Sequence, residues 1–147
     1  MFKHVLVPTD GSPLSESAVS HAVNFARSIQ ARVTFFYAQP DFPMPIYGEG
    51  ALIDPTTPEQ FARSVEAEAQ AILSKAKAVA DSEGVDAATD TVVNEVPYEA
   101  VIDAADRHGC DLIFMASHGR RGLASLLLGS ETQKVLTHSK IPVLVYR

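Results

Sequence analysis

The chain has 147 residues, of which 46% are hydrophobic and 20% charged, which predicts one folded domain over residues 1–147 rather than disorder. Its formal net charge of −6 argues against broad binding to nucleic acid or to anionic membranes. The single cysteine, Cys110, excludes an intramolecular disulfide and a multi-thiolate metal site, and the apolar run beside it indicates a core thiol. Because the sequence has neither an apolar run of about 18 residues nor a signal-peptide pattern, we expect a cytoplasmic protein with no membrane partner.

The first half of the chain predicts two strands that alternate with two helices. Phe2–Val7 is polar near its start and apolar at its end, and Ala31–Ala38 is rich in β-branched and aromatic residues, as expected of strands. Between them, Ser12 can cap a helix that has Pro13 at its first position. A second helix is predicted over about Glu59–Glu83, where Ala and Glu dominate.

The segment that precedes this second helix, Gln39–Pro58, contains five prolines and two glycines. It is predicted to be a long loop, of the kind that acts as a lid or a binding segment. The rest of the chain continues the alternation as strand, helix, strand, helix and strand, over Val85–Asn94, Pro97 to about Gly109, Leu112–Ala116, Ser130–Ser139 and Pro142–Tyr146.

This strict alternation predicts an α/β fold with a parallel sheet, helices on both faces and right-handed crossovers. Phe2–Val7 and Leu112–Ala116 are the most apolar strands and are expected at the centre of the sheet. Val85–Asn94 mixes polar and apolar residues, which favours a sheet edge.

Ligands of open α/β sheets bind beyond the carboxyl ends of the strands. The two most apolar strands end in Pro8–Ser12 and Ser117–Gly122, which are small, polar segments suited to contact a ligand. If the two segments are neighbours, Asp10 faces the glycine loop, and its carboxylate can accept hydrogen bonds from the two hydroxyls of a ribose.

The glycine loop and the following helix predict a phosphate site. Ser130 is expected to cap that helix, with Glu131 in its first turn, and the free N–H groups and helix dipole there favour an anion. Arg120 and Arg121 supply local positive charge. The end of the second strand near Ala38 can offer an apolar slot to adenine, so the parts together describe a nucleotide site.

No residue pattern indicates an enzyme. The chain lacks G-x-x-x-x-G-K-[ST], G-x-G-x-x-G, H-E-x-x-H and G-x-S-x-G. His118 has no acid or nucleophile beside it in the sequence, so a hydrogen bond that orders the loop is the preferred interpretation. We therefore expect a binding protein with, at most, slow ATP hydrolysis, and Mg²⁺ that arrives with the phosphates.

Two motifs, VLVPTDGS near the start and MASHGRRGLASLLLGS near the end, resemble the universal stress protein family, and the likeness covers essentially the whole chain. The resemblance implies a three-layer, Rossmann-like fold with a five-stranded parallel sheet of order 3-2-1-4-5. It also implies a homodimer and, in one subgroup, bound ATP.

That subgroup has glycine, two residues, glycine, nine residues, then glycine and a hydroxyl residue. The spacing matches this chain throughout, but Ala116 stands at the first glycine position. With the early turn included, the implied nucleotide-binding residues are Pro8, Thr9, Asp10, Ala38, Met115, Ala116, Ser117, His118, Gly119, Arg120, Gly122, Gly129, Ser130, Glu131 and Thr132.

In the implied order the last strand lies at an edge, yet Val143–Tyr146 is apolar without alternation. Such an edge favours a homodimer in which this strand meets its copy. Three functions remain open: a dimeric adenine-nucleotide (ATP) binding protein of the stress response; an interaction module of the same fold without nucleotide; and an enzyme related to nucleotide-hydrolysing α/β proteins.

Overall fold

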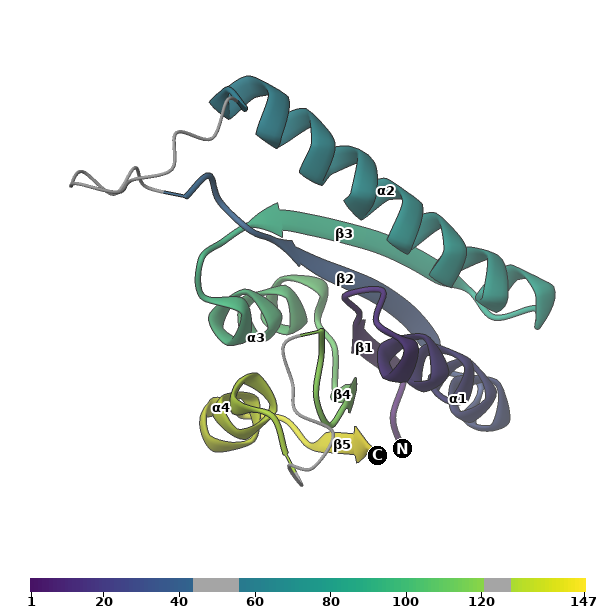
Figure 1. The fold of residues 1–147 in the computed structure, drawn as a ribbon. Coiled ribbons are helices and arrows are strands. Elements are labelled where there is room, and N and C mark those ends of the chain that lie inside the picture. The colour runs from purple at the N-terminus through teal and green to yellow at the C-terminus, as the bar shows by residue number, and fades with distance from the viewer. Residues whose placement is uncertain (44–55, 121–127) are drawn as a thin grey trace.

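The structure is a computed structural model that describes residues 1–43, 56–120 and 128–147. Strands and helices alternate through these residues (Figure 1) as β1 His4–Pro8, α1 Pro13–Ile29, β2 Arg32–Gln39, α2 Pro58–Ser82, β3 Ala87–Val93, α3 Pro97–His108, β4 Leu112–Ala116, α4 Ser130–His138 and β5 Val143–Tyr146. The predicted order of elements is confirmed, with bounds that differ by at most two residues. Most of the predicted lid, residues 44–55, lies outside the described residues.

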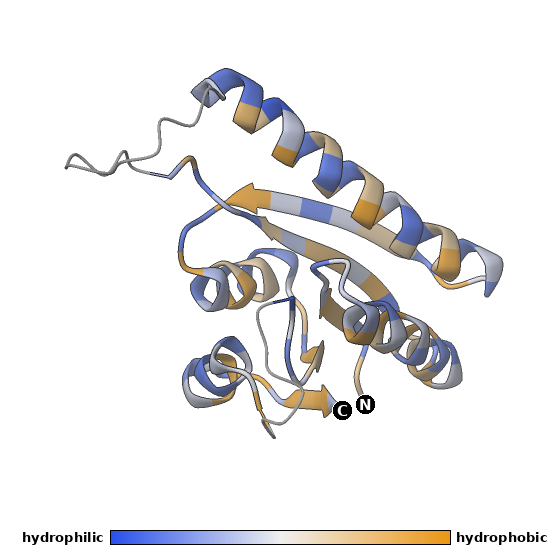
Figure 2. Ribbon diagram, in the orientation of Figure 1, coloured by the Kyte–Doolittle hydropathy of each residue, from blue (hydrophilic) through white to orange (hydrophobic). Residues whose placement is uncertain are grey.

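The strands form one parallel sheet of order β3-β2-β1-β4-β5. The order implied by the family resemblance is therefore confirmed, with β1 and β4 inside the sheet and β3 at an edge. In β4 every residue is buried, whereas β3 is partly exposed along its length. Figure 2 shows the mixed character of β3, which has hydrophilic colour in its middle and hydrophobic colour near its end.

Helices cover both faces of the sheet (Figure 1). On one face, alternate strand residues such as Val7 and Phe35 pack with α1 and α2. On the other face, their neighbours Leu6 and Phe36 pack with α3 and α4. Because successive side chains point to opposite faces and both faces are covered, the inner strands read as continuous apolar runs. Cys110 belongs to the second cluster, and burial raises the pKa of its thiol to about 12, as expected of a core thiol.

Two predicted helix starts had different outcomes. Ser12 is the cap of α1, where its hydroxyl accepts from Ser15 N at 3.3 Å. The prediction that Ser130 caps α4 was wrong, because Gly129 holds the cap position and Ser130 is the first helical residue. Gly129 N donates to the carbonyl of Ser117 at 2.6 Å, a hydrogen bond that ties the cap residue of α4 to the residue after β4.

None of the four helices in the described part of the chain combines the length and the hydropathy that a membrane span requires.

Candidate functional site

The turn after β1 and the loop after β4 meet at the carboxyl edge of the sheet. Asp10 joins them, because its Oδ2 accepts a hydrogen bond from the backbone N of Arg120 at 2.8 Å. Its Oδ1 accepts from the backbone N of Ser12 at 2.9 Å, which closes the early turn. The neighbourhood of residue 10 and the glycine loop, expected from the sequence, is therefore present in the structure.

Gly119 lies against the Asp10 carboxylate. A Cβ atom at position 119 would stand 2.2 Å from Asp10 Oδ2, far inside any contact that carbon and oxygen tolerate. Gly11 has a φ of +76°, but Gly119 is not among the positive-φ glycines of the chain. Glycine is therefore needed at position 119 for space, and its backbone conformation is open to other residues.

The early turn is tied to the elements beside it. Thr9 is buried, its N donates to the carbonyl of Phe36 at 2.9 Å, and its hydroxyl accepts from Ser15 Oγ at 2.7 Å. Each carboxylate oxygen of Asp10 has two lone pairs and accepts one of the protein hydrogen bonds described above. Asp10 therefore has acceptor capacity left for a ligand hydroxyl.

The end of β4 holds the start of α4. Ser117 N donates to Tyr146 O at 2.7 Å, and Thr132 Oγ1 donates to Ala116 O at 3.1 Å. The first intrahelical acceptor of α4 is Gly129 O, which receives Gln133 N at 3.0 Å. The N–H groups before residue 133 therefore precede the helical ladder and, with the helix dipole, create an electropositive helix start beside the loop.

Ala116, the departure from the subgroup pattern, is a buried residue of β4 paired with Tyr146. Its φ is not positive, so the backbone there does not require glycine. Met115 precedes it in the same strand and belongs to the core that α3 and α4 cover. His118 Nδ1 lies 3.2 Å from Oγ of the adjacent Ser117, and its role in ordering the loop stays a prediction. Gly122 lies outside the described residues.

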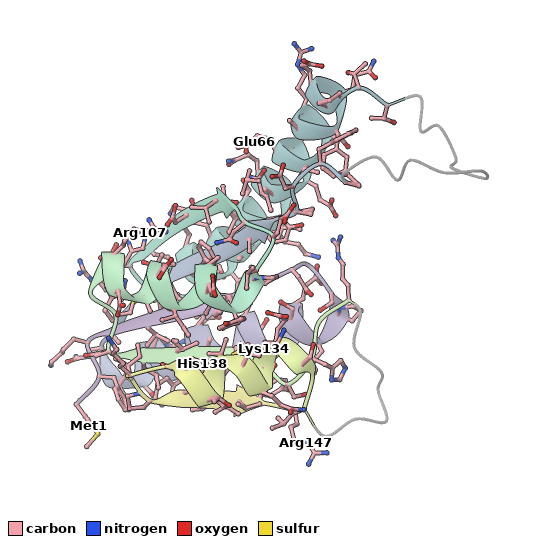
Figure 3. All side chains as sticks on the ribbon, turned by 90° about the vertical axis from the view of Figure 1, so that its left-hand side faces the viewer. Met1, Glu66, Arg107, Lys134, His138 and Arg147 are labelled. Atoms are coloured by element: carbon pink, nitrogen blue, oxygen red, sulfur yellow. The ribbon has the colours of Figure 1, made fainter. Side chains whose placement is uncertain are left out.

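Glu131 lies at the start of α4 but turns its carboxylate toward α3. Oε2 accepts from the backbone N of Tyr98 at 2.9 Å, and Oε1 is 3.2 Å from Lys134 Nζ. Lys134 and His138 lie on the exposed face of α4 (Figure 3), where His138 stacks on the Tyr98 ring. The structure thus gives this acid, predicted as a ligand contact, a role in joining two helices.

Arg120 has a partner that sequence reasoning missed. Its Nη1 lies 2.5 Å from Oε1 of Glu68 on α2, and this hydrogen bond raises the pKa of the guanidinium. Glu68 precedes Ile72 by four residues, so both face the same side of α2. That spacing was visible in the sequence, but nothing in it indicated which side chain they would meet.

The adenine end of the predicted site lies where β2 finishes. Ala38 is half-buried and pairs with Val92 of β3. Next to it, Gln39 Nε2 donates to Glu66 Oε2 at 2.7 Å and to Thr91 Oγ1 at 3.1 Å. A cavity of about 160 Å³ lined by His4, Arg32, Thr34 and other residues belongs to the opposite, amino edge of the sheet. In the described residues, no three His, Cys, Asp or Glu side chains are grouped to hold a metal ion.

Comparison with known proteins places this geometry in a family. The sequence profile of the universal stress protein family matches residues 1–147. The chain is 33% identical to universal stress protein MJ0531 of Methanocaldococcus jannaschii, over all of this chain and 83% of that protein. It is 32% identical to universal stress protein YxiE of Bacillus subtilis, over the full length of both. A universal stress protein solved in complex with cAMP superposes with a TM-score of 0.71 at 28% identity, over 99% of this chain and 97% of that one. This chain therefore belongs to the universal stress protein family.

Proposed function

We propose that this protein binds an adenine nucleotide, ATP with Mg²⁺, between the turn after β1 and the loop after β4, as a cytoplasmic protein of the stress response. The observation that carries the proposal is the contact of Asp10 Oδ2 with Arg120 N at 2.8 Å. This contact brings a carboxylate that can bind ribose hydroxyls next to a glycine loop that can bind phosphates, at the carboxyl edge of a parallel sheet. The related structure with bound cAMP supports an adenine nucleotide as the ligand class.

In this proposal each part of the site contacts one part of the nucleotide. The Asp10 carboxylate accepts hydrogen bonds from the ribose hydroxyls. The loop at Gly119 and the start of α4 at Ser130 donate N–H groups to the phosphates, and Mg²⁺ is held mainly by phosphate oxygens. Adenine lies near Ala38, where main-chain groups at the end of β2 serve as its partners.

We also propose that the protein is not an enzyme beyond slow ATP hydrolysis. His118 has its Nδ1 beside the Ser117 hydroxyl, at 3.2 Å, and within the described residues no carboxylate pairs with it. An imidazole without an orienting acid is a poor general base for activating water. Turnover well above background that is lost in His118→Ala would contradict this part of the proposal.

Calorimetric titration with ATP and Mg²⁺ tests the binding proposal, with Asp10→Ala as the critical variant. A hydrogen bond to a charged group contributes about 1.5–3 kcal/mol, so this variant should bind ATP about ten-fold more weakly or worse. Gly119→Val should also weaken binding, because its side chain would displace the Asp10 carboxylate. Asp106→Ala, which removes the same charge from the exposed surface of α3, is the matched control and should bind as the parent does. A titration that releases no heat, together with no thermal stabilisation at millimolar nucleotide, would refute the proposal.

A second candidate is an interaction module of the same fold that uses no nucleotide. It is favoured by one observation, that Asp10 already accepts from Ser12 N and Arg120 N within the protein. Mass spectrometry of freshly purified protein separates the two candidates. Adenine nucleotide that is released on denaturation would exclude the module, whereas its absence together with a silent titration would favour it.

A further inference from the structure

The ion pair between Arg120 and Glu68 crosses from the loop after β4 to helix α2. The backbone of Arg120 is fixed by Asp10, because its N donates to Oδ2 at 2.8 Å. Its side chain then reaches α2, where Nη1 meets Glu68 Oε1. The two side chains are 47% and 43% exposed, so solvent ions and ligands can reach the pair.

This ion pair lies over the same turn that carries Asp10. A Cβ atom at Gly11 would be 3.1 Å from Arg120 Nη2 and 2.9 Å from Ile72 Cγ1. The guanidinium therefore lies close to the early turn, and so does Ile72, one helical turn after Glu68. The charged end of Arg120 thus stands where the early turn, the glycine loop and α2 come together.

Four ionisable groups share this space. Burial raises the pKa of the Tyr37 phenol, the charges of Glu68 and Asp10 raise it further, and Arg120 lowers it. With the Tyr37 phenol neutral, the Asp10 and Glu68 carboxylates and the Arg120 guanidinium give this cluster a formal charge of −1. A ligand phosphate that binds Arg120 must therefore compete with a carboxylate that is already paired with it.

We propose that Glu68 determines the charge specificity of the nucleotide site, because it competes with ligand phosphates for Arg120. This inference rests on the proposed function and adds a residue outside both sequence motifs. Its consequence is graded. Glu68 weakens the binding of a triphosphate most, that of a monophosphate less, and that of a nucleoside least. The ratio of ATP to adenosine affinity should therefore be smaller than it would be if the loop and the helix start acted without Glu68.

Substitution Glu68→Gln removes the competing charge and keeps the size of the side chain. Because both members of the pair are half-exposed and screened by salt, the expected gain is moderate, about five-fold tighter binding of ATP. AMP should gain less and adenosine should be unchanged. Substitution Arg120→Gln should weaken ATP binding and leave adenosine binding unchanged.

The control variant is Glu83→Gln. Glu83 is the C-terminal cap of the same helix and forms an ion pair with Arg27 at the exposed surface. The Glu83→Gln substitution removes the same charge from the protein as Glu68→Gln does. Any general effect of net charge on nucleotide binding should therefore appear in both variants. Circular dichroism and thermal melting of each variant establish that the fold is retained.

The experiment is a set of calorimetric titrations of adenosine, AMP and ATP into the parent, Glu68→Gln, Glu83→Gln, Arg120→Gln and the Glu68→Gln/Arg120→Gln double variant. We expect the ratio of ATP to adenosine affinity to rise in Glu68→Gln alone. In the Arg120→Gln background most of that gain should vanish, since no guanidinium remains to compete for. If the parent binds nucleotides and Glu68→Gln leaves the ratio unchanged, or if Glu83→Gln raises it equally, this inference is wrong and the proposed function stands. If none of the proteins binds any of the three ligands, the proposed function fails and the inference falls with it.

Discussion

His4 is a polar residue inside the sheet. Its side chain is buried, with Nε2 at 2.7 Å from Thr34 Oγ1, and Nδ1 has no hydrogen-bond partner among the residues that the structure describes. Burial lowers the pKa of this imidazole from its ordinary value of 6.5, and the charge of Arg32 lowers it further. A buried imidazole of this kind is held neutral, because the charged form would lose its hydration.

The lowered pKa predicts a loss of stability in mild acid. As pH falls below about 6.5, the unfolded chain binds a proton at this histidine before the native state does. The free energy of unfolding should therefore decrease between about pH 6.5 and pH 5, above the range in which the carboxylates titrate. In His4→Gln, whose amide keeps a partner for Thr34, this pH dependence should be reduced. Urea unfolding across the range measures it, and the exposed His21→Gln serves as control. Equal slopes in His4→Gln and the parent would contradict the assignment.

Gly119 and Asp10 form a second residue-scale pair, and their contact is steric. In Gly119→Ala the new methyl would lie 2.2 Å from Asp10 Oδ2, so the carboxylate must rotate away from Arg120 N. We expect ATP binding to weaken nearly as much as in Asp10→Ala, with a small change in melting temperature, because the end of one side chain can move cheaply.

A double-mutant cycle checks this reasoning. If the methyl acts through the carboxylate, Gly119→Ala should have no further effect on ATP affinity in the Asp10→Ala background. The two effects would instead add if Gly119 were needed for close approach of the ligand itself. Calorimetric affinities of the four proteins decide between these outcomes.

At the scale of elements, α3 has an unusual start. Its cap residue is Val96, which offers no side-chain cap hydrogen bond, and Pro97 follows it. The carboxylate of Glu131 supplies the missing acceptor from α4, since Oε2 receives Tyr98 N at 2.9 Å. An acid at a helix start also interacts favourably with the helix dipole. One side chain thus stabilises the first turn of α3 and joins it to α4.

Removal of this interhelical cap should destabilise the protein. Side-chain caps contribute about 1 kcal/mol, so Glu131→Ala should lower the free energy of unfolding by about 1 kcal/mol. Lys134→Ala removes the ion pair with Glu131 but leaves the cap, and should cost only about 0.3 kcal/mol. Chemical denaturation measures both. Equal losses in the two variants would show that the ion pair, and not the cap, carries the stabilisation.

The elements that the sequence predicted well are those whose signals are local. The apolar run Leu112–Ala116 was predicted with its observed bounds, because a strand that is buried on both faces has apolar residues at consecutive positions. The cap of α4 was missed because Gly129 is held by a hydrogen bond to Ser117, which is not its neighbour in the sequence. Similarly, the acceptor at the start of α3 lies 33 residues further along the chain, and no local pattern identifies such a partner.

The candidate site divides in the same way. The topology of a parallel sheet brings the ends of β1 and β4 together, so the meeting of Asp10 with the glycine loop could be predicted from strand order. The contact of Arg120 with Glu68 depends on the position of helix α2 along the two strands that it covers, β2 and β3. That position is set by many small side chains acting together, which a single sequence does not resolve.

At the scale of the whole molecule, the two edges of the sheet differ. The edge at β3 includes Asp90, whose carboxylate is bonded to Arg107 and His108 of α3. The edge at β5 is the apolar segment Val143–Tyr146, and all four of its residues are half-buried. A polar edge with occupied side chains resists pairing with another chain, whereas an apolar edge favours it. We therefore propose a two-fold homodimer that pairs through β5.

The backbone of β5 indicates how to test this dimer. Ile113 N donates to Pro142 O at 3.0 Å, and Ser117 N donates to Tyr146 O at 2.7 Å. Because successive peptide groups of a strand point to opposite sides, the even-numbered residues face β4 and Val145 directs its N–H to the free edge. A proline at position 145 would remove that outward donor and no hydrogen bond to β4.

Val145→Pro should therefore convert the dimer into a folded monomer, because antiparallel pairing of β5 with its copy needs the outward N–H groups. Val145→Thr, which keeps the N–H and a β-branched side chain, should remain dimeric. Light scattering after size-exclusion chromatography gives the mass of each protein, and circular dichroism reports whether the sheet is retained. A parent protein that elutes as a monomer, or a folded Val145→Pro variant that stays dimeric, would contradict pairing through β5.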